Sequence, residues 1–176
     1  MTMVVLRATQ KVLRLLPEPV GSSASSTNAL GDWYVNRIVV DRQPLLLLVS
    51  SMSLLAVVIK ARDVAALPQR LAAVIGARLR RLGIAGEILA SEVEAASAVA
   101  VAKTVDRSVT GQMVEFAKMI SFYLPEGRWN EDQLKPVEDW LAQTPCRVSG
   151  PSKGVIFPRE RAIALLENKW SRSVRH

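Results

Sequence analysis

Two continuous apolar runs constrain the fold most: LLLLV at 45–49 and LLAVVI at 54–59, neither of which carries a charge. Short apolar runs bounded by turn residues are typical of strands in a sheet that is covered on one or both faces. The β-branched and aromatic run WYVNRIVV at 33–40 precedes them, and DRQP at 41–44 predicts a turn. Because the connections are short, neighbouring strands must run antiparallel. We therefore predict a meander of three strands.

The stretch from Gln43 to Ile59 is uncharged, but it does not predict a membrane span. It is shorter than the roughly 20 apolar residues that a spanning helix needs, and Pro44 interrupts it. MTMVVLRATQ at the start has neither a basic region nor a long apolar region, so we expect no signal peptide. The single cysteine, Cys146, fits a reducing compartment. We expect a cytoplasmic protein without a membrane partner.

The remaining pattern predicts an α+β fold, with helices packed on a mostly antiparallel sheet of about five strands. We expect two further strands, at 4–8 and 98–102, and helices at about 9–16, 64–82, 85–97, 113–124, 130–141 and 158–170. Residues 17–31 are rich in Pro, Ser and Gly and predict a loop. We divide the chain into a core domain at 1–125 and a basic helical extension at 126–176, packed on the core or tethered to it.

Positive charge is concentrated at the end of the chain. Residues 1–146 hold 16 basic and 14 acidic side chains, a net of +2, whereas residues 147–176 hold seven and two, a net of +5. A basic segment favours nucleic acid or a nucleoprotein as partner. The candidate contacts are Arg159, Arg161, Lys169, Arg172 and Arg175, with Arg78, Arg80 and Arg81 at the end of a predicted helix. A solvated helix end is the simpler interpretation of the last three.

The stretch KTVDRSVTGQM at 103–113 has two interpretations. Backbone N–H groups at a helix start, with Lys103 and Arg107 nearby, could hold a phosphate. Alternatively Asp106 or Ser108 caps the helix while Arg107 pairs with an acid such as Asp32. Capping is the commoner use of such residues, and we favour it.

Residue types limit the chemistry. The single histidine, His176, is the last residue, so neither a histidine-based triad nor a His/Cys metal site is credible. We expect no metal and no cofactor. We expect Trp33 to anchor the core, and Asp32, Trp33, Asp106 and Ser108 form a possible polar cluster. An enzyme whose site combines Asp32, Asp106 and Arg107 is one hypothesis, and it requires these three side chains to converge.

Three stretches, LRATQKVLRLL, ALGDWYVNRIVVDRQPLLLLVSSMSLLAVVI and AKTVDRSVTGQMVEFA, occur in that order. Together they resemble an uncharacterised family of small bacterial proteins, a domain of unknown function with GDWYxN-like and DRSVxGxM-like motifs. The resemblance covers roughly residues 3–124, and Gln112 and Val114 depart from its pattern. It implies a bacterial cytosolic domain and no particular mechanism.

We therefore expect a small non-catalytic binding protein that contacts nucleic acid or a nucleoprotein. A protein-interaction module, such as an antitoxin-like or regulatory subunit, is the alternative, and an enzyme is the second alternative.

Overall fold

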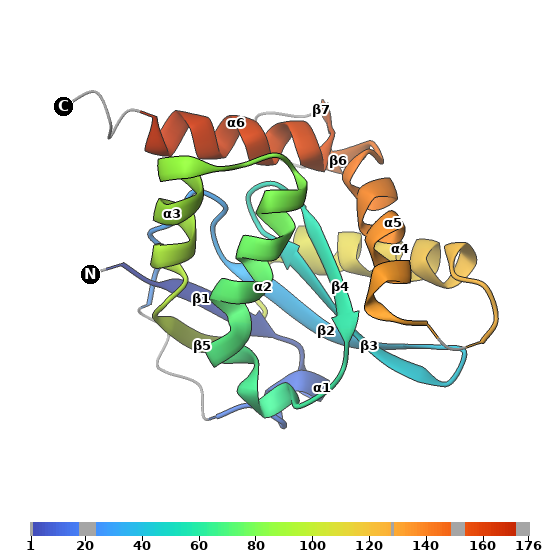
Figure 1. Cartoon of the computed structure of the whole chain (residues 1–176). Helices are drawn as coiled ribbons and strands as arrows, with labels where there is room; N and C mark the ends of the chain where they lie inside the picture. The colour runs from blue at the N-terminus through green and yellow to red at the C-terminus, as the bar shows by residue number, and fades with distance from the viewer. Residues whose placement is uncertain (1, 18–23, 128, 149–153, 172–176) are drawn as a thin grey trace.

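A five-stranded sheet forms the centre of the molecule (Figure 1). The computed structural model describes residues 2–17, 24–127, 129–148 and 154–171. The sheet has the order β4-β3-β2-β1-β5. Its strands are β1 (Val4–Ala8), β2 (Trp33–Val40), β3 (Gln43–Ser50), β4 (Ala56–Lys60) and β5 (Val99–Lys103). The predicted α+β fold, with a sheet of about five strands and helices packed on it, is confirmed.

Strands β2, β3 and β4 form the predicted antiparallel meander. Val40 pairs with Gln43, so the turn between β2 and β3 contains only Asp41 and Arg42. Both turn residues have positive φ angles, 47° and 63°. Two-residue hairpin loops need this backbone because its twist matches that of the flanking strands. The turn therefore fixes the register that buries the leucine run of β3.

Strand β1 makes the sheet mixed, because it pairs in parallel with β2 on one side and with β5 on the other. Parallel neighbours need crossover connections. The chain between β1 and β2 contains α1 (Gln10–Leu13), and the chain from β4 to β5 passes through η1 (Val64–Ala66), α2 (Leu67–Arg81) and α3 (Gly86–Ala95). Strand β1 thus lies inside the sheet, between β2 and β5, although it precedes both of them in sequence.

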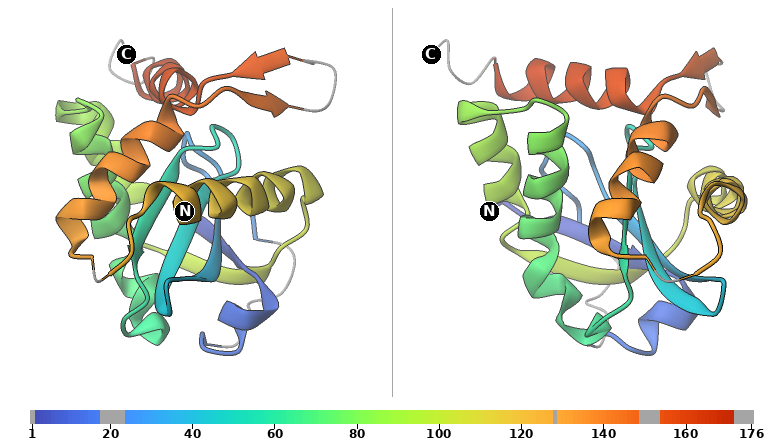
Figure 2. Two further views of the ribbon diagram at one scale, coloured as in Figure 1. Left: turned by 90° about the vertical axis from the view of Figure 1, so that its right-hand side faces the viewer. Right: turned by 45° about the vertical axis from the view of Figure 1, so that its right-hand side comes forward.

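Helices cover both faces of the sheet (Figure 2). Helices α2, α3 and α6 (Pro158–Trp170) enclose one core with Trp33 and Leu48. Helices α4 (Arg107–Tyr123) and α5 (Glu131–Ala142) enclose the other with Tyr34 and Leu47. Alternate residues of one strand point to opposite faces, so neighbouring apolar residues serve different cores. This explains why the apolar runs are continuous.

The C-terminal segment contains one element that we did not predict. Strands β6 (Cys146–Val148) and β7 (Gly154–Ile156) form a short antiparallel hairpin, whereas the stretch CRVSGPSKG at 146–154 predicts only a turn region. Each strand is only three residues long, too short for a periodic pattern in the sequence. Helix α6 follows over the predicted range, 158–170.

Helix α6 is attached to the rest of the molecule by a buried carboxylate. Glu92 on α3 is 1% exposed and accepts four hydrogen bonds. The donors are Asn28 Nδ2 at 3.1 Å, the Ala29 and Leu30 backbone N–H groups at 2.9 and 3.1 Å, and Trp170 Nε1 at 2.7 Å. One side chain thus joins α3, α6 and the segment before β2.

Helix α5 begins where the sequence predicts, and one of its side chains is placed differently. Asn130 and Gln133 form a reciprocal capping box at its start. Pro136 lies inside the helix, which begins at Glu131. Its spacing from Val137 and Leu141 predicts that Trp140 lies on the apolar face, but Trp140 is 37% exposed. A large aromatic side chain at the boundary of the apolar stripe of a helix can lie partly in solvent.

Candidate functional site

The arginines at the end of α2 differ in their burial and in their partners. Arg78 is 2% exposed, so the interpretation that it belongs to a solvated basic face is wrong. Its Nε donates to the Ala56 carbonyl at 3.1 Å and its Nη2 to the Glu138 carbonyl at 3.3 Å. Burial lowers the pKa of Arg78, against the attraction of Glu138. Arg80, by contrast, is exposed.

Arg81 also forms ion pairs within the molecule. Its guanidinium lies 2.5 Å from Glu138 Oε1 and 2.5 Å from Asp139 Oδ1, both on α5. Glu138 is buried, and desolvation raises its pKa more than Arg78 and Arg81 lower it. These ion pairs join α2 to α5, which leaves Arg80 as the arginine of this group that is open to solvent.

Side chains also close the outer edge of strand β4. In the β3–β4 ladder, the Ser50 N–H donates to the Leu55 carbonyl and the Ala61 N–H donates to the Pro44 carbonyl. Because hydrogen-bonded pairs alternate with non-hydrogen-bonded pairs in an antiparallel ladder, every second residue of β4 between Leu55 and Ala61 turns its N–H and C=O groups away from β3. Glu138 Oε2 accepts a hydrogen bond from the Val58 N–H at 2.8 Å, and Arg78 donates a hydrogen bond to the Ala56 carbonyl. Exposed edge groups invite pairing with another chain. The α2–α5 ion pairs therefore protect this edge.

The DRSV stretch is a helix start. Asp106 is the N-terminal cap of α4, and its Oδ1 accepts from the Ser108 N–H at 2.8 Å and from Ser108 Oγ at 2.7 Å. These hydrogen bonds lower the pKa of Asp106. Tyr34 Oη accepts from the Asp106 N–H at 3.1 Å, which joins α4 to β2. The predicted cap at Asp106 is confirmed, but Arg107 is exposed and forms no ion pair with Asp32 within the described residues.

The GDWY stretch is likewise explained by packing. Gly31 has a φ angle of +75°, and a Cβ there would lie 2.5 Å from Met52 Cγ. Only glycine fits such a backbone at so close an approach. Trp33 is fully buried, as predicted, and Tyr34 is 1% exposed.

Asp32 pairs with a residue that we did not single out. Arg7 Nε lies 2.6 Å from Asp32 Oδ2, and Ser26 Oγ donates to Asp32 Oδ1 at 2.6 Å. Arg7 Nη1 also donates to the carbonyl of Lys103 at 2.9 Å, which joins β1 to β5. Among the described residues, no hydrogen bond or ion pair joins Asp32 to Asp106 or Arg107. The convergence that the enzyme hypothesis requires is therefore not supported by these contacts.

The structure describes some of the basic residues of the C-terminal segment. Arg159 and Arg161 are exposed in the first turn of α6, and Arg147 is exposed on β6. Lys169 Nζ lies 5.4 Å from the ring centroid of Trp170. Lys103 is exposed at the end of β5. Arg172, Arg175 and His176 lie outside the described residues, as do residues 149–153 of the stretch SGPSKG.

The described residues offer little nucleophilic or metal chemistry. Cys146 is buried, and desolvation raises its pKa to about 11, which disfavours the reactive thiolate. Across residues 2–17, 24–127, 129–148 and 154–171, no three His, Cys, Asp or Glu side chains gather as a metal site would require. In the same part of the chain, no helix is long and apolar enough to cross a membrane.

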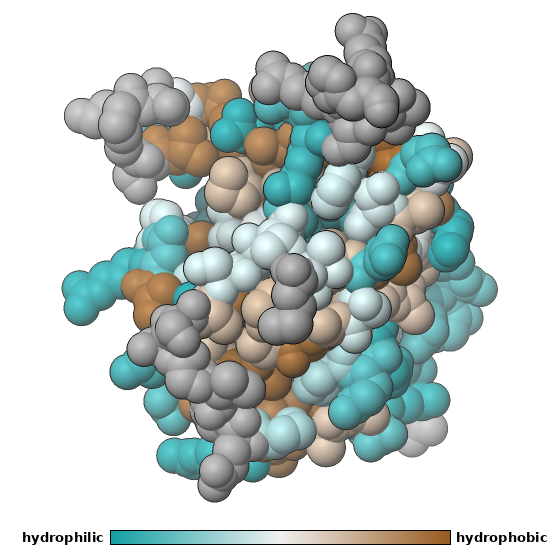
Figure 3. Space-filling view, turned by 90° about the vertical axis from the view of Figure 1, so that its left-hand side faces the viewer, coloured by the Kyte–Doolittle hydropathy of each residue, from teal (hydrophilic) through white to brown (hydrophobic). Residues whose placement is uncertain are grey.

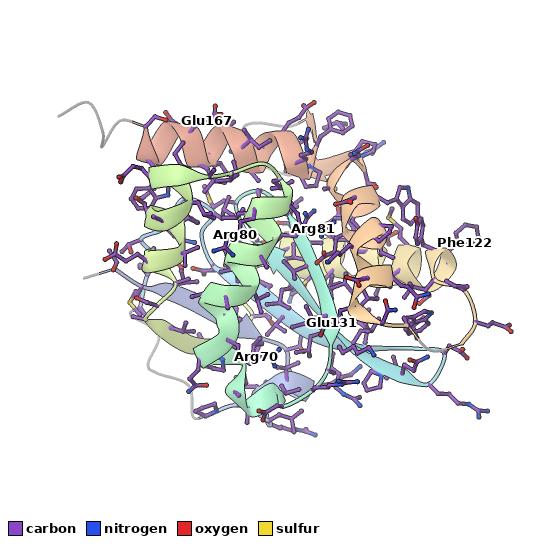
Figure 4. All side chains as sticks on the ribbon, in the orientation of Figure 1. Arg70, Arg80, Arg81, Phe122, Glu131 and Glu167 are labelled. Atoms are coloured by element: carbon purple, nitrogen blue, oxygen red, sulfur yellow. The ribbon has the colours of Figure 1, made fainter. Side chains whose placement is uncertain are left out.

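Exposed aromatic side chains form a feature that the sequence did not reveal. Phe122 is 88% exposed at the end of α4 (Figure 4). Beside it in sequence, Tyr123 stacks on Trp140 of α5 with ring centroids 5.0 Å apart. By contrast, the side of the molecule seen in Figure 3 shows apolar and polar residues interspersed. Aromatic side chains are enriched at protein interfaces.

One comparison with known proteins agrees with the expectation that the chain is an uncharacterised domain. The comparison with curated proteins found no match. Residues 5–161 match the family described as Domain of unknown function (DUF6933). The match includes both the GDWY and the DRSV stretches and extends through α5 into α6. The chain therefore belongs to this family of uncharacterised domains.

Proposed function

We propose that this chain is a non-catalytic bacterial cytosolic protein that binds nucleic acid or a nucleoprotein through the terminal basic surface. We define this surface as Arg147, Arg159 and Arg161. The observation that carries the proposal is the contrast between two groups of arginines. Arg78 and Arg81 are engaged in ion pairs, whereas Arg147, Arg159 and Arg161 are exposed and form no ion pair within the described residues.

Unpaired cations are the groups that gain most from contact with phosphates, because binding releases condensed counterions. The same surface carries Val155 and Phe157, which are 58% and 40% exposed. An aromatic ring beside arginines can stack on an unpaired base. The net charge of +5 in residues 147–176 supports the same partner.

The test compares two variants that lose equal charge. Arg159→Gln/Arg161→Gln removes two cations of the terminal basic surface, and Lys11→Gln/Arg14→Gln removes two exposed cations at α1. Binding of DNA and RNA oligonucleotides is measured over a series of salt concentrations. We expect the first variant to lower the slope of log affinity against log salt by about 2, because each phosphate contact contributes about 0.9 for B-DNA. Equal effects of both variants, or no binding at low salt, would exclude this surface.

Protein interaction is the second candidate function. It is favoured by the exposed Phe122 and the Tyr123–Trp140 stack, since solvated aromatic clusters are typical of interfaces. Tagged protein and a Phe122→Ser/Trp140→Ser variant are purified from the native host after nuclease treatment. A stoichiometric protein that is retained only by the unsubstituted chain supports this function. Recovery of the same protein by both forms would argue against the aromatic surface.

A further inference from the structure

A cavity of about 310 Å³ lies at the end of the sheet where β3 begins and β4 ends. Figure 1 shows the end of β4, the β2–β3 hairpin and the chain that leads into α5 at this end of the sheet. The volume is near the lower limit of ligand pockets, so the cavity suits a small molecule or one terminal group of a larger one. Of the described residues that line it, none belongs to the terminal basic surface.

The charge in this cavity is positive. Lys60 on β4 and Arg62, two positions further on, supply its cations, and none of the described lining residues is acidic. Neither side chain forms a hydrogen bond or an ion pair with another described residue. Lys60 is also half-buried. A cation that is partly removed from water attracts an anion more strongly than a fully solvated cation does.

Two buried apolar side chains form the floor of the cavity. Leu45 and Trp129 are 1% and 2% exposed and belong to the same core cluster. Trp129 Nε1 donates to the Pro125 carbonyl at 2.9 Å, so the indole N–H is already engaged. The floor therefore offers apolar surface, which lowers the local dielectric beside the two cations.

Backbone hydrogen bonds hold the two cations close together. The Ala61 N–H donates to the Pro44 carbonyl at 3.1 Å, and the Arg62 N–H donates to the Lys60 carbonyl at 2.9 Å. The Arg62 carbonyl in turn accepts from Arg70 Nη1 at 3.2 Å. The Cα atoms of two residues in this relation are at most about 7 Å apart. Because both long side chains line the same cavity, one anionic group lies within reach of both.

The wall formed by the hairpin is also held in place. Gln43 Nε2 donates to the Gly127 carbonyl, and the Gly127 N–H donates to Asp41 Oδ2 at 2.7 Å. These two hydrogen bonds fasten the β2–β3 hairpin to the chain that leads to Trp129. The Asp41 carboxylate is engaged by this contact and does not line the cavity.

We propose that this cavity binds a phosphomonoester group. Such a group carries a charge of about −1.5 to −2 at pH 7 and has three acceptor oxygens. Arg62 binds two of these oxygens through its planar guanidinium, and Lys60 binds as a point charge. Because two cations face no lining carboxylate, a dianion is bound more strongly than a monoanion. The inference does not rest on nucleic-acid binding by the terminal basic surface.

The test uses the full chain with methyl phosphate as the ligand. Dimethyl phosphate has the same chemistry with one negative charge fewer, and it serves as the control at equal ionic strength. Backbone amide chemical shifts are followed by NMR at about pH 8, where the phosphomonoester is a dianion. We expect methyl phosphate to bind in the millimolar range and to shift the amides of residues 43, 45, 60–62 and 129. Dimethyl phosphate should bind about tenfold more weakly.

Variants assign the site. Lys60→Gln and Arg62→Gln should each weaken methyl phosphate binding about tenfold, the value of one charge-assisted hydrogen bond. Arg80→Gln removes an exposed arginine outside the cavity and should bind normally. If Lys60→Gln does not fold, Arg62→Gln decides, because Arg62 is exposed. Equal binding of dimethyl phosphate, an equal loss in Arg80→Gln, or no amide shift around the cavity overturns the proposal.

An oligonucleotide with and without a 5′-phosphate identifies the source of the group. If only the 5′-phosphorylated form shifts the amides of the cavity, the group belongs to the end of a nucleic acid. If methyl phosphate shifts them and neither oligonucleotide does, the group belongs to a small molecule. Binding at the terminal basic surface shifts the amides of Arg147, Arg159 and Arg161 instead. The same spectra therefore separate a failure of this proposal from a failure of the proposed function.

Discussion

At the scale of single residues, Glu92 is the side chain with the largest expected effect on stability. Its carboxylate accepts four hydrogen bonds in a buried site. In Glu92→Gln, an amide group replaces one carboxylate oxygen, and donors then face donors. We expect the free energy of unfolding to fall by about 2 kcal/mol or more, since hydrogen bonds to charged groups are the stronger ones. Urea denaturation measures the change.

The matched control for Glu92 is Glu94→Gln, two residues further along the same helix and exposed. It removes the same charge without disturbing a buried group, so its effect should stay within about 0.5 kcal/mol. Similar losses in both variants would mean that charge on α3, rather than the buried hydrogen bonds, determines stability.

Asp106 makes stability depend on pH at the acid end. The hydrogen bonds from Ser108 lower its pKa in the folded state. The cap therefore contributes fully above the ordinary Asp pKa, and its contribution is lost as pH falls through the lowered value. Asp106→Ala should cost about 1 kcal/mol at neutral pH. Asp106→Asn should keep most of the cap and lose its pH dependence, which denaturation at pH 7 and in the acid range tests.

Single residues also show what sequence reasoning can and cannot reach. The cap at Asp106 and the buried Trp33 were predictable because local spacing and residue type determine them. The partner of Asp32 was not, because Arg7 lies 25 positions away and meets it only through the parallel pairing of β1 with β2. Likewise, nothing local distinguishes the buried Arg78 from the exposed Arg80.

At the scale of elements, helix α5 is held against β4 by Glu138. Glu138→Ala would leave Arg78 buried without its neighbouring charge and would leave the Val58 N–H without an acceptor. Breaking a buried ion pair from one side costs about 3–5 kcal/mol, so we expect a loss of this size in urea denaturation. The control, Asp132→Ala, removes an exposed pair with Lys135 and should change the free energy of unfolding far less than Glu138→Ala.

Exchange of backbone amides would locate the effect of Glu138→Ala. We expect the amide protons of β4 to lose protection more than those of β1, because the edge of β4 loses its cover. A uniform loss across the sheet would show instead that Glu138 contributes only to global stability.

Elements were predictable in proportion to their length and periodicity. The strands of the meander have five to eight residues and α6 has 13, whereas the hairpin of β6 and β7 has strands of three. The parallel pairing of β1 could not be read from β1 itself, because a five-residue apolar strand looks the same in either orientation. Trp140 was assigned to the buried face because helical spacing alone does not show which neighbouring element covers the boundary of the apolar stripe.

At the scale of the whole molecule, the C-terminal helix shares a core with the sheet. Leu166 of α6 is fully buried in the cluster that contains Leu71 of α2. We therefore expect Leu166→Ala and Leu71→Ala each to cost about 2–5 kcal/mol and to shift one common transition. Calorimetry should give equal calorimetric and van't Hoff enthalpies for both variants.

This experiment also tests the division of the chain at residue 125. The contrary result is that calorimetry resolves two transitions and that Leu166→Ala shifts only one of them. That result would show that residues 126–176 unfold as a separate unit. A single transition would mean that deletion of the C-terminal segment cannot serve as a binding control, because it would also remove part of the core.

The position of β1 has a consequence for synthesis on the ribosome. This strand is made before both of its neighbours, β2 and β5, and β5 ends at Lys103. Strand β2 can pair with one edge of β1 early in synthesis, but the other edge stays without its partner until residues 99–103 have also been made. Over that interval the backbone groups on this edge of Val4 to Ala8 lack their final partners. The order of translation and the order of the sheet are thus in conflict at the very first strand.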